Sequence, residues 1–495
     1  MRLSTSGRTY RAVRIHPVVG FIAAVGVAVT LVASPQVAAA PRTAAASDRE
    51  RGKPNIILFL TDDQSLADME ALHYVSRRIG RHGTTFTRSF SQYPLCCPAR
   101  ATLITGQYAH NHGVMGNEPP HGGFDRFRDR ETLPVWLRRA GYNTVMLSKY
   151  LNGYDKGTRY VPPGWTNWQA PVSDIYDYRN FTMNENGRLV RYHDYQTSHW
   201  QHRGASLIRR YAARRKPFFL WAGFLAPHAG TPIERDDPMA KKRGGLPTPG
   251  VAREFRNALA GTRLPDKPSF MEPDMSDKPG LRGRTHRPRR EFREAHQQRL
   301  ESLLSVDKAV RAMLKALDRT GEAERTVVIF TSDNGHLMGE HRRFSKTVGY
   351  EESARVPFLV SGPGFSAGVA RDQLVSLADI ASTIAKAAGA RTRLVQDGRP
   401  LQRLSADPRA GSDRAILLEA GPAGRTHGRR LYTGIRTPDD RVLLRWWSGA
   451  TELYNLSEDP FQLDGTIGTG ETREEHDLLS ARLDELQDCA GAACR

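Results

Sequence analysis

Short uninterrupted apolar runs alternate with helical patterns along most of the chain. The runs 55–60 (NIILFL) and 326–331 (TVVIFT) do not alternate polar and apolar residues, which is typical of strands covered on both faces. Three more runs are candidate strands of the same sheet: Asn143–Leu147, Phe218–Phe224 and Pro357–Ser361. The helical patterns lie between them, at 133–140, 204–215, 291–318 and 377–388. This order predicts an α/β domain with a mostly parallel sheet.

Two regions depart from this pattern. Residues 229–290 are rich in Pro, Gly, Lys and Arg, which predicts a long irregular excursion that could shape the mouth of a site. After residue 390, short strand patterns follow one another (415–419, 431–436, 442–447, 452–454), and a helical pattern covers 474–487. We therefore expect a large domain over 50–389 and a small α+β subdomain over 390–495.

The first 46 residues have the order of a secretory signal peptide: scattered arginines, an apolar run over 18–33, and small residues after it. No Arg-Arg pair precedes the run, which favours the general secretory route. The alternative is an uncleaved anchor, although the run is shorter than the ~20 residues that span a bilayer. We expect a secreted protein with no membrane span after removal of the signal at 1–46. The cleavage position is open.

Composition and charge narrow the function classes. With 39% hydrophobic and 25% charged residues among 495, the chain is neither disordered throughout nor a multi-span membrane protein. The formal charge of +19 indicates affinity for anions, unless an arginine-rich proteome simply places Arg on every surface. Nucleic acid is not an expected partner, because the export signal is present and no recognition motif is found. A candidate polyanion site, or else a solvated loop, is formed by Arg282, Arg284, Arg287, Arg289 and Arg290.

The four cysteines are too few for a disulfide scaffold. Cys489 and Cys494 stand close together at the C-terminus, and in an exported protein we expect them to pair. Two free thiols are the alternative. Cys96 and Cys97 are adjacent, and an unpaired thiol is a liability outside the cell, so this pair needs another explanation.

Oxygen-rich pairs follow both continuous apolar runs. Asp62-Asp63 follows the first and Asp333-Asn334 follows the second. Ligand sites of open α/β sheets gather beyond the carboxyl ends of the strands, and two Asp pairs would repel there without a cation. Such oxygen donors suit Ca²⁺ or Mg²⁺ better than Zn²⁺. Each pair could instead cap a helix, but two pairs on two matched strands favour a metal site.

Cys96-x-Pro98-Ala99-Arg100, followed by LxTG at 103–106, resembles the signature of the type I sulfatase family. In that family this Cys is oxidised to formylglycine before folding, by a formylglycine-generating enzyme. Further stretches over about residues 53–490 are similar to N-acetylglucosamine-6-sulfatases and extracellular heparan sulfatases: LCCPARATLITGQYAHNHGV, SKYLNGY, VPPGW, LSVDKAV, TSDNGH and VPFLVSGPG. The resemblance implies an alkaline-phosphatase-like α/β fold, with a mostly parallel sheet between helices. It also implies hydrolysis of a sulfate ester, on a sulfated sugar such as an N-acetylglucosamine-6-sulfate unit.

The resemblance also implies roles for single residues. The calcium ligands would be Asp62, Asp63, Asp333 and Asn334, with formylglycine at Cys96 completing the site. This matching favours Ca²⁺ over Mg²⁺, for which the ligand types are equally suited. Arg100 would hold the formylglycine, Lys149 and Lys346 would contact the sulfate oxygens, and His228 would touch the ester oxygen.

Several positions depart from the family pattern or stay unassigned. Ala99 replaces the commoner Ser, and Leu151 stands where many sulfatases have His, as in the glucosamine-6-sulfatase branch. The residue that orients the hydrated aldehyde is therefore not identified. His110 and His112 are near the signature, and either a place in the site or plain packing fits them. The role of Cys97 is open.

Two other functions remain compatible with the sequence. A phosphonate monoester hydrolase or phosphodiesterase could use the same formylglycine site. A non-catalytic, basic polyanion-binding protein would need no such site, and the full set of catalytic side chains argues against it. The sequence leaves open the sulfate position, exo or endo action, the oligomeric state and the host's capacity to make formylglycine.

Overall fold

In the computed structural model, the two continuous apolar runs are neighbouring strands, β1 (Asn55–Asp62) and β9 (Thr326–Ser332). They run parallel, with Thr61 opposite Ser332 at their carboxyl ends. The structure describes residues 52–154, 158–281, 286–422, 426, 428–466 and 470–495, and residues 53–495 form one compact unit. The expected signal peptide at 1–46 lies outside the described residues. Within them, no helix combines the length and apolar character that crossing a membrane requires.

Within the described part of the chain, ten strands form the main sheet, in the order β13-β2-β12-β9-β1-β8-β4-β5-β6-β7. Its centre is parallel from β9 to β5, and β12, β6 and β7 run antiparallel to their neighbours. The remaining bounds are β2 Thr84–Phe86, β4 Asn143–Leu147, β5 Asn167–Ser173, β6 Phe181–Glu185, β7 Arg188–Tyr192, β8 Phe218–Pro227, β12 Phe358–Ser361 and β13 Val369–Arg371. The mostly parallel sheet is confirmed.

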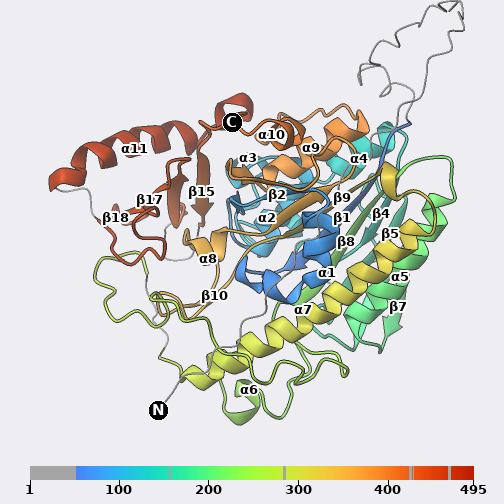
Figure 1. Cartoon of the computed structure of the whole chain (residues 1–495), viewed down its shortest axis with the longest axis horizontal. Coiled ribbons are helices and arrows are strands. Elements are labelled where there is room, and N and C mark those ends of the chain that lie inside the picture. The colour runs from blue at the N-terminus through green and yellow to red at the C-terminus, as the bar shows by residue number, and fades with distance from the viewer. Residues whose placement is uncertain (1–51, 155–157, 282–285, 423–425, 427, 467–469) are drawn as a thin grey trace, which may run out of the picture. The chain divides into compact units, whose positions relative to one another are not determined.

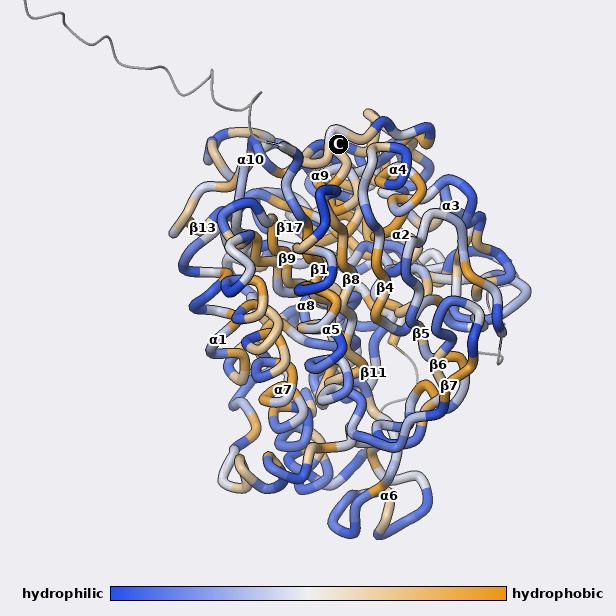
Figure 2. Tube along the Cα trace, turned by 90° about the vertical axis from the view of Figure 1, so that its right-hand side faces the viewer, coloured by the Kyte–Doolittle hydropathy of each residue, from blue (hydrophilic) through white to orange (hydrophobic). Residues whose placement is uncertain are grey.

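Helices cover both faces of this sheet. Ile56, Leu58 and Leu60 pack into one core, and the alternate residues Ile57 and Phe59 pack into the other. Because successive strand side chains point to opposite faces, a strand with two covered faces is apolar throughout. Figure 1 shows α2, α4 and α9 on one side of the sheet and α5 and α7 on the other, and the tube in Figure 2 is orange along the central strands. The helix bounds are α2 Cys96–Thr105, α4 Leu133–Arg139, α5 Gln196–Ala212, α7 Arg289–Asp318 and α9 Ala378–Ala388.

Some elements were not anticipated from the pattern. Strands β5 to β7 were missed because they mix polar and apolar residues at the edge of the sheet. Helix α2 was missed because its ten residues are all buried and show no amphipathic face. Helix α5 begins eight residues before the predicted 204. Between β8 and α7, the described residues hold one short helix, α6 (Pro238–Lys241), which agrees with the predicted irregular excursion.

The C-terminal part forms a second sheet, with four antiparallel strands in the order β15-β16-β17-β18. Helix α11 (Arg473–Leu486) packs against it, and Cys489 and Cys494 form the predicted disulfide. The strand bounds are β15 Ile416–Ala420, β16 Tyr432–Arg436, β17 Arg441–Trp446 and β18 Thr451–Asn455. The small α+β arrangement expected at the C-terminal end is therefore present, and its sheet begins at β15.

Candidate active site

The ends of β1 and β9 bring the two oxygen-rich pairs together. Asp63 follows β1 in the left-handed region, with φ at 68°, and its backbone N–H donates to Asp333 Oδ1 at 3.1 Å. The backbone N–H of Asp333 donates to the carbonyl of Thr61 at 3.1 Å. Adjacent parallel strands end at the same edge of a sheet, so the strand register alone places these side chains side by side.

Helix α2 places Cys96 at this edge. Cys96 is its first residue, and its Sγ lies 3.3 Å from Asp62 Oδ1 and 3.9 Å from Asp63 Oδ1. The thiol is buried. Cys97 belongs instead to the hydrophobic core under the sheet, and its backbone N–H donates to Asn117 Oδ1 at 3.0 Å. The two adjacent cysteines therefore have different surroundings, and only Cys96 faces the carboxylates.

Arg100, one helical turn after Cys96, is fully buried and joins a carboxylate from each of the two oxygen-rich pairs. Its Nε lies 2.8 Å from Asp333 Oδ2 and its Nη2 lies 3.1 Å from Asp62 Oδ2. Its Nη1 donates to the carbonyl of Lys149 at 2.7 Å. All three bonds of the guanidinium fork are thus used to hold the site's framework, as a planar donor group permits.

Two lysines approach from distant segments. Lys149 follows β4, and its Nζ lies 2.8 Å from Asp62 Oδ2. Lys346 follows the short strand β11 (Phe344–Ser345), pairs with Asp63 Oδ1, and lies 2.9 Å from Cys96 Sγ. The thiol is thus surrounded by two carboxylates and an ammonium group.

His228 stands just beyond β8 and completes the cluster. Its Nε2 lies 3.6 Å from Asp63 Oδ2, while its Nδ1 lies 2.6 Å from the carbonyl of Ala229. A proton on Nδ1 satisfies that carbonyl, which leaves Nε2 facing the carboxylates. The ring of Tyr176 stacks on His228 at 4.8 Å, and Lys149 Nζ lies 4.9 Å from the centre of the same Tyr ring. Tyr176 therefore packs against two of the predicted site residues.

Burial and charge oppose each other at these groups. Burial alone would raise the pKa of Asp62, but Lys149 and Arg100 outweigh it and lower that pKa. Burial and the charge of Asp62 raise the pKa of Asp333 to about 6 and that of the Cys96 thiol to about 12. Burial would lower the pKa of Lys346, but Asp63 and Cys96 raise it. The lysines are therefore held as cations inside the protein.

The oxygen donors fit a divalent cation. One ligand atom each from Asp62, Asp63, Cys96 and His228 lies within 4.8 Å of the others. Asn334 Nδ2 donates to Asp63 Oδ1 at 2.7 Å, and its Oδ1 is buried without a hydrogen-bond partner in the described part of the chain. A buried amide oxygen without a partner costs free energy, and a bound hard cation would satisfy it. The structure thus brings together all five residues predicted to hold the metal.

A cavity of about 240 Å³ opens onto the cluster. Asp63, His228 and Lys346 line it, together with Arg299 and His336, which the sequence analysis did not single out. Arg299 Nη2 donates to the carbonyl of Asp63 at 2.6 Å and to Asp68 Oδ2 at 2.6 Å, so it supports the strained turn after β1. Arg299 could have been noticed as an arginine within a buried stretch of a long helix. His336 could have been noticed because it directly follows the SDNG sequence at 332–335.

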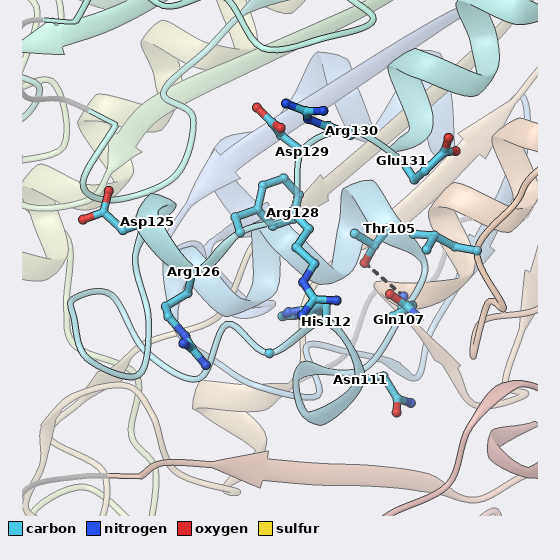
Figure 3. Close-up of a pocket in the computed structure, with 13 residues that line it drawn as sticks. Thr105, Gln107, Asn111, His112, Asp125, Arg126, Arg128, Asp129, Arg130 and Glu131 are labelled. Atoms are coloured by element: carbon cyan, nitrogen blue, oxygen red, sulfur yellow. Dashed lines mark hydrogen bonds between the residues drawn. The ribbon is translucent and has the colours of Figure 1, made fainter.

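His110 and His112 lie outside this cluster. His112 Nε2 is 3.1 Å from Thr102 Oγ1, and His110 Nδ1 is 3.1 Å from Glu419 Oε1 in β15. His112 lines a separate cavity of about 870 Å³ at the far end of α2, into which Arg128 extends toward it (Figure 3). Apart from His112, that larger cavity contains none of the histidines, cysteines or metal ligands named from the sequence.

A model of the sulfatase family matches residues 54–390, which include every residue of the cluster. The chain belongs to the sulfatase family. Members of this family hydrolyse sulfuric esters, so the predicted family and enzyme class are confirmed. A second model, "N-sulphoglucosamine sulphohydrolase, C-terminal", matches residues 339–489.

Individual relatives of this sulfatase agree with the family assignment. A Caenorhabditis elegans protein described as a homolog of extracellular sulfatase Sulf-1 is 33% identical over 365 residues, which cover 71% of this chain and 49% of that protein. The chain thus spans about half the length of that relative. Human N-acetylglucosamine-6-sulfatase is 28% identical over 493 residues, covering 90% of this chain and 86% of the relative.

A solved structure shares the fold. It is a protein in complex with its substrate D-glucosamine-2-N,6-O-disulfate, with a TM-score of 0.69 at 22% identity, covering 88% of this chain and 97% of that one. This likeness confirms the alkaline-phosphatase-like fold with its small C-terminal sheet.

Proposed function

We propose that this protein is a secreted sulfatase that hydrolyses a sulfate ester of a carbohydrate through a formylglycine made from Cys96. One observation carries the proposal: the first residue of α2 sits among Asp62, Asp63 and Lys346, in contact with both carboxylates and the ammonium group. The names of the relatives, N-acetylglucosamine-6-sulfatase among them, support a sulfated sugar such as an N-acetylglucosamine-6-sulfate unit as substrate. The extracellular relative and the N-terminal pattern support export.

The charges of the site suit a sulfate monoester. The ester is a stable anion, so cleavage needs positive charge around its oxygens, a nucleophile and a proton for the leaving alcohol. Lys149 and Lys346 supply fixed positive charge next to the position of Cys96, and Arg100 keeps the carboxylates in place beneath it. Because these cations are already held in position, they need no rearrangement when the sulfate binds.

A calcium ion held by Asp62, Asp63, Asp333, Asn334 and residue 96 would supply further positive charge to the sulfate oxygens and to the attacking oxygen. Once hydrated, formylglycine supplies an attacking hydroxyl, and its second hydroxyl allows sulfate to be expelled with return of the aldehyde, which a Ser or Cys side chain could not do. Maturation would then require a formylglycine-generating enzyme as a partner.

The remaining steps fall to side chains of the chain itself. Lys149 and Lys346 both point into the cluster, where they would bind the sulfate oxygens and so orient the reacting sulfur. His228 Nε2 faces the same space, and in the doubly protonated ring, with Nδ1–H still bound to the Ala229 carbonyl, it is positioned to give its proton to the departing alcohol oxygen, with Lys346 as a second donor. Arg299 keeps Asp63 in its left-handed turn by binding its carbonyl.

The test combines mass mapping with a paired assay. Protein purified from its native host is digested, and the peptide that contains Cys96 and Cys97 is mapped by mass spectrometry. We expect an aldehyde at residue 96 and a thiol at residue 97, and turnover of an aryl sulfate above that of a phosphate diester. An unmodified thiol at 96 in active native material would overturn the proposal, and faster turnover of the diester would favour a phosphodiesterase or phosphonate monoester hydrolase.

A further inference from the structure

A third cavity, of about 500 Å³, lies at the start of α7, away from the catalytic cluster. Four of its six lining residues are arginines: it is lined by Arg263, Leu264, Asp266, Arg289, Arg290 and Arg293. All four arginines are exposed. A single carboxylate faces four guanidinium groups, so the cavity carries a net positive charge.

In the described part of the chain, three of these four arginines have no carboxylate partner, and the fourth packs on an aromatic ring. Among the described residues, no carboxylate lies within ion-pair distance of Arg263, Arg290 or Arg293, and Arg289 stacks over the ring of Phe270 at 4.6 Å. The carboxylate in the first turn of the helix, Glu291, is already bound by Lys242 at 2.7 Å and cannot serve them. Four guanidinium groups around one cavity repel one another unless an anion lies between them.

The start of α7 adds to this field. The helix is 30 residues long, and the positive end of its dipole lies at this start, where it favours a negative charge nearby. The cavity therefore combines two independent preferences for an anion, one from the guanidinium groups and one from the helix end. Guanidinium forks bind sulfate and carboxylate oxygens in pairs, which makes such groups the matching ligands.

A series of ring contacts shows that this cavity lies close to the catalytic site. Phe270 contacts Phe292 at 5.3 Å, and Phe292 contacts Phe344 at 6.2 Å between ring centres. Phe344 lines the opening beside His228 and Lys346. Phe270 also forms an isolated antiparallel bridge with Glu340, which lies two residues after the short strand β10 (Leu337–Met338), and Figure 1 shows the start of α7 and the loops before it near that strand. Phe292 is fully buried, so these rings are a small core between the two places, and a ligand that reached both would lie over the surface above it.

We propose that this arginine-lined cavity binds the anionic groups of a carbohydrate chain whose reacting sulfate lies at residue 96. The inference rests on the proposed function, and it adds that the substrate is a polyanionic chain gripped at a distance from the reacting unit. Single-stranded nucleic acid is the less fitting ligand, because the described lining contains no aromatic side chain on which bases would stack.

The test compares two variants that remove the same charge. The cavity variant carries Arg263→Gln, Arg290→Gln and Arg293→Gln, and leaves Arg289 in its packing against Phe270. The control variant carries Arg209→Gln, Arg391→Gln and Arg473→Gln, three exposed arginines from other parts of the chain. Both are applied to immobilised heparin and eluted with salt, and both are assayed on an aryl sulfate and on a heparin-derived oligosaccharide.

We expect the cavity variant to elute at lower salt than the control and to show about a tenfold higher KM for the oligosaccharide, as the loss of three exposed ion pairs would give. Its kcat and KM for the aryl sulfate should match the control. Equal elution of the two variants would overturn the inference. So would release of the protein from immobilised heparin by single-stranded DNA at a lower concentration than by the oligosaccharide. Release of the protein by hyaluronan, which has carboxylates but no sulfates, shows whether the cavity binds carboxylates as well as sulfates.

Failure of the proposed function gives a different result. If the native protein turns over no sulfate ester but the cavity variant still loses heparin affinity relative to the control, the proposed function is wrong and the binding site stands. If turnover is normal and the two variants behave alike on heparin and on the oligosaccharide, the inference is wrong and the proposed function stands.

Discussion

The catalytic cluster and the arginine-lined cavity both contain several charged side chains, but those of the cluster are buried and paired, whereas those of the cavity are exposed. In the cluster, Arg100, Asp62 and Asp333 have fully buried side chains and bind one another. In the cavity, Arg263, Arg290 and Arg293 are exposed and have no ion-pair partner in the described part of the chain. A buried charge must be paired, whereas an exposed charge can remain open for a ligand. The paired charges of the cluster fix the positions of its side chains, and the unpaired charges of the cavity attract an anionic ligand.

The largest expected effect separates the two adjacent cysteines. Cys96→Ala should abolish turnover, because the attacking oxygen would be lost, whereas Cys97→Ala removes a core thiol and should retain most activity. Turnover of an aryl sulfate by both purified variants measures this. Equal loss of activity in the two variants, with both folded by circular dichroism, would contradict the assignment of the nucleophile to residue 96.

The next effect tests whether burial of charge distinguishes the two regions. Arg100→Met would leave Asp62 and Asp333 without their shared partner, and breaking such a buried pair costs about 3–5 kcal/mol. Arg290→Met should leave the free energy of unfolding unchanged, because that side chain is exposed. Urea unfolding compares the two. If Arg100→Met is no less stable than Arg290→Met, the cluster is not the paired network described here. Arg100→Lys, which keeps the charge but loses the fork, should fall between them.

Calcium should distinguish the two regions, because the cluster groups several ligand atoms whereas the cavity is lined by a single carboxylate. At a hundredfold excess over its Kd, a ligand that binds only the folded protein stabilises it by about 2.7 kcal/mol. We expect the melting temperature to rise with calcium in the native protein and to rise much less in Asn334→Ala, which lacks the unpaired amide oxygen. Potassium chloride at equal ionic strength is the control. An equal rise in both proteins would show that the ion binds elsewhere.

The smallest effect concerns a largely buried pair between His110 and Glu419 of the C-terminal sheet. Burial disfavours a charged His110, but its hydrogen bond to Glu419 outweighs this and raises the pKa of His110. A raised pKa in the folded protein stabilises it below the unfolded value of about 6.5, and this stability is lost as pH rises through the folded pKa.

We therefore expect His110→Gln to lose about 1–2 kcal/mol of unfolding free energy at pH 5.5 and much less at pH 9. His82→Gln, at an exposed position, is the matched control. Urea unfolding at the two pH values measures the difference. A loss that does not change with pH would mean that His110 acts by packing and not by charge.

Whether a helix or strand could be predicted from the sequence depends on the hydrophobic pattern of its residues. Buried strands such as β1 and β9 were predicted, because a strand covered on both faces is apolar at every residue. The edge strand β7 and its neighbour β6 were not predicted, since both mix polar and apolar residues. Helix α2, buried all round, has no periodic apolar stripe to reveal it.

The residues of the candidate site also fall into those that the sequence predicted and those that it did not. Residues inside a motif, such as Asp62, Asp333 and Cys96, were found because their neighbours in sequence mark them. Arg299 and Tyr176 were missed, because what matters about them is contact with Asp63 and His228 across long stretches of chain. A pattern of neighbouring residues contains no record of such contacts.

The sequence by itself determined the local states of the chain: which runs form buried strands, where oxygen donors follow them, and which cysteine has the family's signature. Only the tertiary structure decided which of these meet. Lys346 reaches Cys96 across 250 positions because β1 and β9 are parallel neighbours and β11 leads back over their ends. The arginines of the cavity come together because the irregular segment folds against the start of α7. Local hydrophobic periodicity sets secondary structure, while strand register and packing between distant segments set the distances on which binding and chemistry depend.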